Sequence, residues 1–290
     1  MWQEIGVQFL RNVLGAISLD NYQAYGHFLG NLLWNFLPER KKYTISSLQK
    51  HLSVDYVQAK RLAKSNFLHT GTSFLESLLV QRLDYRYLQP KITLNDPALV
   101  EQLAKTSRPV VVTTAHLGPW ELLLAVLKFY FPDKPTQVIV KFPKNKFLAQ
   151  LILACRKQRN VEIIGHRQAS SKVIPHLRRG GLAAFLVDHN TLRKEAIFLP
   201  FLGELAAVNL GPALLAIRTK ALVYPAFVLR TNDFKIKLIL KKPLDTRKLK
   251  GNFQEKLFTV AKFYTRAVEE QVLKRPEQWY WLHKRWKTRP

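Results

Sequence analysis

The sequence predicts an α/β fold: a mixed, largely parallel central sheet flanked by helices, with a helical region at the N-terminus. Two observations support this prediction. Between about residues 108 and 240, short apolar or β-branched segments of strand length alternate with longer segments of helix length. Such alternation is typical of parallel strands joined by crossover helices. Before residue 90, apolar residues recur at helical spacing, and no strand pattern is found before about residue 108.

The elements follow one another in order along the chain. A β-branched run at residues 109–114 predicts a buried strand, and the apolar segment 122–131 after it has the length of a helix. The later elements are predicted as strands at 137–140, 161–164, 182–187, 222–229 and 234–240, and as helices at 145–159, 170–179, 210–218 and 255–273.

The charge balance indicates an anionic partner. The 290 residues include 46 Lys plus Arg against 20 Asp plus Glu, a formal net charge of +26. Nucleic acid, an anionic membrane face and an acidic carrier protein are the candidates. The basic residues are scattered along the chain, which favours a broad basic face over one basic tail. Because Cys155 is the single cysteine, an intramolecular disulfide is excluded. Its thiol is predicted to be buried.

Residues 1–90 are predicted to form a helical, membrane-associating region, and residues 91–290 the α/β domain, the two forming one continuous structural unit. The sequence contains no clear signal peptide or transmembrane span. Residues 22–37 are the best candidate, but a span needs about 20 mostly apolar residues. Their aromatic side chains, followed by the basic run 40–42, fit a helix lying in a membrane interface. A helix that packs against the core explains the pattern equally well.

One short segment has residues suited to acid–base chemistry. His116 follows the predicted strand 109–114, Gly118 permits a tight bend, and Pro119 suits the first position of a helix. Glu121 then lies in the first helical turn. A spacing of five does not place two side chains on one helix face, so the bend is needed to bring them together. A carboxylate that orients a histidine prepares it to act as a general base.

The segment 116–121 resembles the His-x4-Asp/Glu signature of the lysophospholipid-type acyltransferases. Residues 118–122 look like the version found in the late acyltransferases of lipid A biosynthesis, the lauroyl/myristoyl class. Residues 186–190, 197–203 and 276–290 agree with that family in order and spacing. The resemblance covers nearly the whole chain, including the helical N-terminus.

The resemblance implies roles for particular residues. His116 is the implied general base and Glu121 the carboxylate that orients it. Substrate-binding roles are implied for Lys141 and Asn145, where the family often has Arg-Pro and a nearby Asn, and for Arg156, near a family Arg. Lys141 stands where the family has the Arg of Arg-Pro, and a lysine lacks the bidentate donor that an arginine provides.

Asp188 is the fourth implied substrate-binding residue. It stands at the first position of the family's Asp-x-Asp, where it is expected to bind an Arg or an acceptor hydroxyl. The second position is Asn190, which argues against a divalent metal there. No metal and no cofactor are predicted.

The C-terminal cluster leaves three interpretations open. Its aromatic residues, interleaved with Lys and Arg, could stack on nucleic-acid bases, sit among lipid headgroups, or pack as a structural element. The resemblance favours a structural or phosphate-facing role, and His283 is interpreted as structural. The aromatic residues are Trp279, Tyr280, Trp281 and Trp286.

The resemblance implies a membrane-associated O-acyltransferase that transfers a fatty acyl group from an acyl-carrier-protein thioester to a hydroxyl of a lipid A precursor or related glycolipid, by direct transfer with His116 as the base. The resemblance implies acyl-carrier protein as donor, an anionic lipid acceptor, and the cytoplasmic face of a bacterial inner membrane, with peripheral or N-terminal attachment. No nucleic-acid partner is predicted. The alternatives are acylation of a lysophospholipid or phosphoinositide glycolipid, a catalytically inactive membrane-binding relative, and a basic nucleic-acid-binding protein.

Overall fold

The computed structural model describes residues 14–80, 82–83, 85–140, 161–166, 169–233 and 235–290. In this part of the chain an eight-stranded sheet has the order β1-β9-β8-β2-β5-β3-β4, with β10 paired to β8. Neighbours along this order are parallel except β8 and β9. The predicted fold class is therefore confirmed. The strands of this sheet are β1 (Ile92–Leu94), β2 (Val110–Thr114), β3 (Thr136–Val140), β4 (Val161–Gly165), β5 (Leu182–Leu186), β8 (Leu222–Arg230), β9 (Ile236–Leu240) and β10 (Leu244–Asp245).

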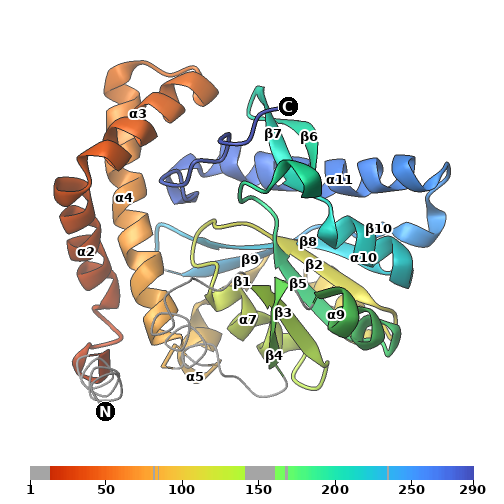
Figure 1. The fold of residues 1–290 in the computed structure, drawn as a ribbon. Helices are drawn as coiled ribbons and strands as arrows, with labels where there is room; N and C mark the ends of the chain where they lie inside the picture. Colours follow the sequence, from red (N-terminus) through yellow and green to blue (C-terminus); the bar gives the residue numbers. More distant parts are fainter. Residues whose placement is uncertain (1–13, 81, 84, 141–160, 167–168, 234) are drawn as a thin grey trace, which may run out of the picture.

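Helices cover both faces of the sheet (Figure 1). On one face α9 (Ala169–Arg178), α10 (Gly211–Thr219) and α11 (Phe253–Lys274) contribute to one apolar cluster. On the other face α6 (Pro97–Lys105) and α7 (Leu122–Tyr130) contribute to a second. Helices α2 (Tyr22–Phe36), α3 (Pro38–Leu52) and α4 (Tyr56–Leu79) stand beside the sheet. The short helices are α5 (Tyr85–Leu88), η1 (Gln89–Lys91), η3 (Arg193–Glu195), η4 (Thr246–Lys248) and η5 (Pro276–Gln278).

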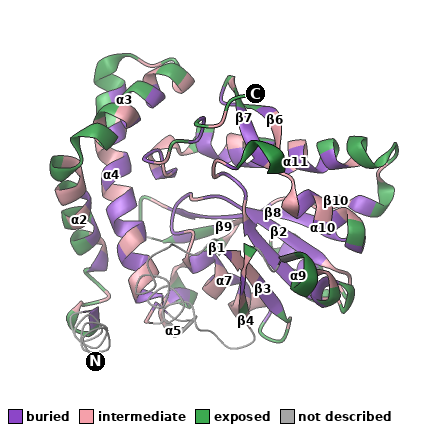
Figure 2. Cartoon of the chain, viewed as in Figure 1, coloured by how far each residue is buried: buried purple, intermediate pink, exposed green. Residues whose placement is uncertain are grey.

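The alternation of side chains along each strand explains the two clusters. In β2, Val111 packs with the α9–α11 side, whereas Val110 and Val112 pack with the α6–α7 side. Because both faces are covered, all five residues of β2 are buried (Figure 2). A strand buried on both sides reads as a continuous apolar run, which is why the sequence predicted it.

Several elements were not predicted from the sequence, among them α6 and β10. Strand β1 precedes residue 108, where no strand was expected; it is three residues long and pairs only with the edge of β9. Such a short strand is too brief to display alternation. A two-stranded hairpin, β6 (Ala196–Phe201) and β7 (Glu204–Asn209), was not predicted as strands. The helix predicted at 145–159 lies outside the described residues.

Helices α2 and α4 pack through glycines at very short range. A Cβ added to Gly71 of α4 would lie 2.3 Å from the backbone nitrogen of Gly30 and 2.4 Å from the carbonyl oxygen of Gly26, both in α2. The two backbones therefore touch directly, and small residues are required at the crossing. Among the described residues no helix is both long and apolar enough to cross a membrane.

We expect Gly71→Ala to destabilise the protein by about 1–3 kcal/mol, because the added methyl must separate two packed backbones. Urea unfolding measures this change. Gly15→Ala is the matched control, since a Cβ at Gly15 meets nothing within 4 Å. Equal unfolding free energies for the two variants would contradict the packing described.

Candidate active site

The register of two parallel strands brings His116 and Asp188 together. Thr114, the last residue of β2, is paired with Leu186, the last residue of β5. His116 and Asp188 each lie two residues beyond those paired ends. The segments that follow β2 and β5 both leave the sheet at the carboxyl ends of its strands, where ligand sites of open α/β sheets are found.

Asp188 binds the histidine at two points. One carboxylate oxygen lies 2.9 Å from His116 Nδ1, and the other accepts from the His116 backbone N–H at 2.9 Å. The indole N–H of Trp279 donates to that second oxygen at 2.8 Å. Since a carboxylate accepts the Nδ1 hydrogen, the lone pair of the neutral imidazole lies on Nε2, as a general base requires.

The charge of Asp188 is maintained despite deep burial. The residue is only 2% exposed. Burial alone raises the pKa of a carboxyl group, but the charge and hydrogen bond of His116, with a smaller contribution from Trp279, bring the pKa of Asp188 well below its usual range. Asp188 is therefore ionised across the physiological range and can stabilise an imidazolium at His116.

Glu121 and His116 both contact Trp120. The Trp120 indole N–H donates to Glu121 Oε1 at 3.2 Å, and the Trp120 ring meets the His116 ring edge-on with centroids 5.4 Å apart. The carboxylate that contacts Nδ1 of His116 in the structure belongs to Asp188, for which the sequence analysis implied a substrate-binding role. A role for Glu121 in orienting the base stays a prediction.

The remaining predicted binding residues are not placed. Lys141, Asn145 and Arg156 lie outside the described residues, as does Cys155. Asp188, which the sequence analysis assigned to substrate binding, instead contacts His116. The signal that could have identified its contact was the equal offset of His116 and Asp188 from the ends of their two strands.

The C-terminal cluster is part of the core. Trp279, Trp281 and Arg285 are each 1% exposed, and Arg285 donates to the carbonyl of Ala207 at 2.6 Å. Of the three interpretations, the structural one applies to these side chains, because they are not accessible to bases or headgroups. The same segment supports the site, since the backbone N–H of Tyr280 donates to the carbonyl of His116 at 2.9 Å.

A small apolar cavity of about 60 Å³ opens beside Trp120 and Glu121. It lies between α7 and the sheet, and Thr114 at the end of β2 contributes to its wall. Its remaining lining residues are all aliphatic or aromatic: Leu123, Leu124, Leu127, Val138, Ile139, Val140, Ala184, Phe185 and Leu186. A hydrocarbon chain is the kind of ligand that such a lining fits.

A carboxylate-bound histidine beside an apolar cavity can deprotonate a hydroxyl next to a hydrocarbon-binding wall, which is chemistry that an acyltransferase needs. The family model described as bacterial lipid A biosynthesis acyltransferase matches residues 2–288, and the chain belongs to this family.

Two curated relatives from Escherichia coli (strain K12) are similar over long stretches. The lipid A biosynthesis lauroyltransferase is 23% identical over 294 residues, covering 100% of this chain and 92% of the relative. The lipid A biosynthesis palmitoleoyltransferase is 24% identical over 186 residues, covering 63% of this chain and 58% of the relative. The solved 1-acyl-sn-glycerophosphate acyltransferase from Thermotoga maritima covers 86% of this chain and 96% of its own, with 11% identity and a TM-score of 0.36, too low to support an argument.

His283 gives the site a pH-dependent contribution to stability. Its ring lies 6.5 Å from that of His116, and its Nε2 atom is buried without a hydrogen-bond partner in the described part of the chain. Burial, opposed by the charge of Asp188, lowers the pKa of His283 from 6.5 to about 4. Between these values the unfolded chain binds a proton that the native protein does not, so native stability falls as the pH falls.

We expect His283→Gln to lose less stability than the native protein when the pH is lowered from 6.5 towards 4. The difference should approach about 1.4 kcal/mol per pH unit, the contribution of one proton. Urea unfolding at a series of pH values measures it. Parallel curves for the two proteins would show that His283 is not held neutral by the fold.

Proposed function

We propose that this protein is a membrane-surface O-acyltransferase that transfers a fatty acyl group from an acyl-carrier-protein thioester to a hydroxyl of a lipid A precursor or related glycolipid. The observation that carries the proposal is the contact between His116 and the ionised Asp188 at the sheet edge, beside an apolar cavity. Family membership supports the reaction class and the lipid A acceptor. The site of action we propose is the cytoplasmic face of a bacterial inner membrane.

The chemistry is a direct transfer. Nε2 of His116 takes the proton of the acceptor hydroxyl as the oxygen attacks the thioester carbonyl carbon, forming a tetrahedral intermediate. The carbon–sulfur bond then breaks, an ester remains on the acceptor, and the thiolate leaves with the proton from His116. Asp188 stabilises the imidazolium formed between these two steps. No covalent acyl–enzyme is required, because the acceptor provides the nucleophile.

The oxyanion of the intermediate needs hydrogen-bond donors from outside the histidine loop. The backbone N–H of His116 donates to Asp188, that of Leu117 to the carbonyl of Ala115, and that of Gly118 to the carbonyl of Gln278. These three amides are already engaged within the protein. We propose Lys141 and Arg156, to which the family resemblance gives substrate-binding roles, as donors to the oxyanion.

Donor and acyl chain each have a feature that suits them. A net charge of +26 favours encounter with an acidic carrier protein. The apolar cavity next to Trp120 and Glu121 is proposed to take the acyl chain, because it reaches from the carboxyl end of β2 into the α7 side of the sheet. An acyl chain lying there places its carbonyl end near His116, whose ring packs against Trp120.

The proposal is tested by incubating purified protein with acyl-carrier thioesters and a panel of lipid acceptors, with the products read by mass spectrometry. We expect acylation of a lipid A precursor, and loss of product formation in His116→Ala. Asp188→Asn should lower kcat by about 10³–10⁴-fold, because the amide disturbs the tautomer and leaves the imidazolium unstabilised.

Asp233→Asn is the matched control, since Asp233 is an exposed carboxylate that pairs with Lys235. Its kcat should equal that of the native protein. Full turnover by His116→Ala would reject the mechanism. Product on lysophospholipid alone would reject the proposed acceptor.

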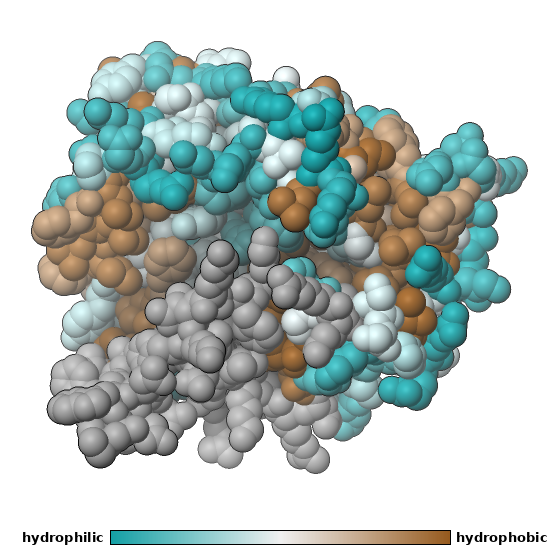
Figure 3. Space-filling model, viewed as in Figure 1, coloured by the Kyte–Doolittle hydropathy of each residue, from teal (hydrophilic) through white to brown (hydrophobic). Residues whose placement is uncertain are grey.

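The proposed membrane face is the outer side of α2. This helix contains no charged residue, and its side chains Tyr25, Phe28 and Phe36 are 48%, 64% and 76% exposed. Their positions, together with Leu32, form one stripe of the helix. Brown side chains gather over α2 at the left edge of Figure 3. An uncharged helix too short to span, with aromatic side chains facing solvent, suits the interface of a bilayer.

Cations near the C-terminal end of α2 support the same orientation. Lys41 lies 5.0 Å and Lys64 5.2 Å from the centre of the Trp34 ring. Anionic headgroups attract such residues by about 1 kcal/mol each near the surface. Aromatic side chains in the interface with lysines beside them give both an apolar and an electrostatic contribution to binding.

We expect the double variant Phe28→Ser, Phe36→Ser to bind vesicles of mixed anionic and zwitterionic phospholipid at least about tenfold more weakly, since each ring contributes about 1.5 kcal/mol or more when buried. Co-sedimentation at several salt concentrations measures the affinity. Phe258→Ser is the control, because Phe258 is 41% exposed on the charged helix α11. Unchanged sedimentation of the double variant would exclude α2 as the membrane face.

A further inference from the structure

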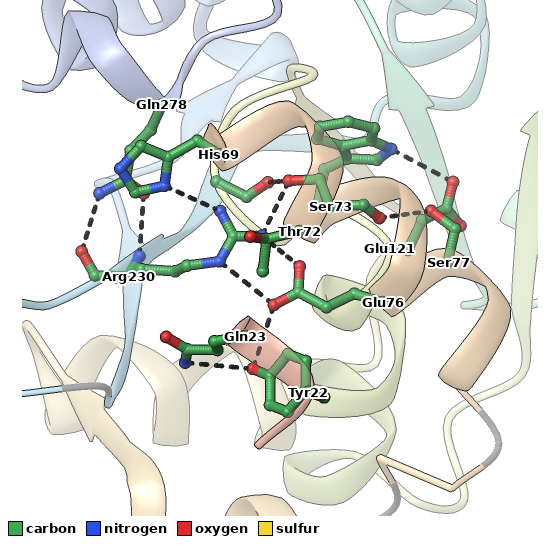
Figure 4. Close-up of polar contacts among 12 residues, drawn as sticks. Tyr22, Gln23, His69, Thr72, Ser73, Glu76, Ser77, Glu121, Arg230 and Gln278 are labelled. Carbon is green, nitrogen blue, oxygen red and sulfur yellow. Dashed lines mark hydrogen bonds and ion pairs between the residues drawn. The ribbon is translucent and has the colours of Figure 1, made fainter. Parts of the chain in front are cut away.

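A buried ion pair lies close to the loop that carries His116. Glu76 of α4 and Arg230 at the end of β8 are 1% and 5% exposed and form a salt bridge. Arg230 Nε lies 3.2 Å from Glu76 Oε1, which also accepts from the hydroxyl of Tyr22 at 3.1 Å. Figure 4 shows these side chains converging from α2, α4 and β8, with His69 beside the guanidinium.

One chain of hydrogen bonds runs from this pair to the loop. Arg230 Nη2 donates to Ser73 Oγ at 2.8 Å, and Ser73 Oγ donates to the carbonyl of Gly118 at 2.8 Å. Because the oxygen of Ser73 accepts from the guanidinium, its own hydrogen is directed to Gly118. Ser73 is 2% exposed, so water does not compete for these bonds.

A second series of hydrogen bonds connects the backbone of Arg230 to Gly118. Its N–H donates to Gln278 Oε1 at 2.9 Å, and its carbonyl accepts from Gln278 Nε2 at 2.8 Å. The carbonyl of Gln278 in turn accepts from the N–H of Gly118 at 2.9 Å. Both polar groups of the Gly118 backbone are thus bound by partners that contact Arg230.

The position of Gly118 in the loop accepts no residue with a side chain. Its φ is +61°, in the left-handed region, and a Cβ there would lie 2.2 Å from the carbonyl oxygen of Val228. The residue is therefore pressed against β8, two positions after His116. A change in the bonds to Gly118 is transmitted directly to the peptide units that position the histidine.

The ion pair is not needed for packing alone. Burying two charges is unfavourable unless each is well compensated, and an apolar pair of similar volume often serves stability as well. Here the guanidinium donates to Ser73 and orients its hydroxyl, and an aliphatic replacement would have no donor for this bond. The buried charges are explained by the geometry that they impose on the loop.

We propose that Arg230, Glu76 and Ser73 are positioning residues for the acyl transfer: through Gly118 they fix the loop that places His116 against its substrates. This inference rests on the function proposed above. A displacement of about 1 Å at a reacting group is sufficient to lower a rate by about 10²-fold. The three residues act on the chemical step and leave the binding of donor and acceptor largely unchanged.

The test is Ser73→Ala, which deletes the oxygen between Arg230 and Gly118. We expect kcat to fall by about 10–100-fold, while KM for the acyl donor changes less than about twofold. Thr265→Val is the matched control, because it removes a hydroxyl that is 5% exposed and donates to a backbone carbonyl in α11 at 2.8 Å. Its kcat should remain that of the native protein even if its melting temperature falls as far as that of Ser73→Ala.

A second variant tests the ion pair. Glu76→Gln keeps the shape of the side chain and removes its charge. We expect a reduced kcat, and in combination with Ser73→Ala a loss smaller than the product of the two separate losses, since both act on Gly118. Losses that multiply would show that the pair and the serine act independently, and would overturn the role assigned to the ion pair.

The outcomes separate this inference from the proposed function. If the native protein transfers acyl groups and His116→Ala does not, but Ser73→Ala matches Thr265→Val, positioning through Ser73 is rejected and the function stands. If the native protein transfers no acyl group to any acceptor, the function is rejected and the inference with it. A rise in KM without a fall in kcat would place Ser73 in substrate binding and reject positioning.

Discussion

The in-register parallel pairing of β2 with β5 is the constraint on which the site depends. It sets Thr114 opposite Leu186, so that His116 and Asp188 leave the sheet side by side. A slip of one residue would turn the side chains of a strand to the opposite face of the sheet. Because helices pack closely on both faces, that slip would exchange the side chains that fill the two apolar clusters, and the packing therefore enforces the register.

This arrangement requires a carboxylate in the interior of the protein. An isolated charge there would be strongly unfavourable, and Asp188 is ionised because it accepts from the backbone and ring of His116 and from the indole of Trp279. These contacts explain the position of the aromatic C-terminal segment. Trp279 donates its indole N–H to the carboxylate of Asp188, and the backbone N–H of Tyr280 donates to the carbonyl of His116.

The sequence predicted the longer buried elements but not how they pair with one another. Strands such as β2 were predicted because burial on both faces requires an apolar run, whereas the three residues of β1 give no such signal. His116 was identified from its place at a strand end. The contact of Asp188 with it was not, because 72 residues separate them and strand order in the sheet is not written in local periodicity. The C-terminal tryptophans have the same composition whether buried or exposed, so only packing could decide between the interpretations.

Tyr22 connects the proposed membrane face with the proposed chemistry. It is the first residue of α2 and donates to Glu76, the carboxylate that pairs with Arg230. Since α2 also packs directly against α4 through glycines, the helix proposed to lie in the bilayer cannot shift without disturbing the ion pair. In the proposed orientation, close packing and buried hydrogen bonds therefore set the position of His116 relative to the membrane surface. In the proposed reaction, a lipid hydroxyl would have to reach His116 at a fixed height above the bilayer, and the fold itself would determine that height.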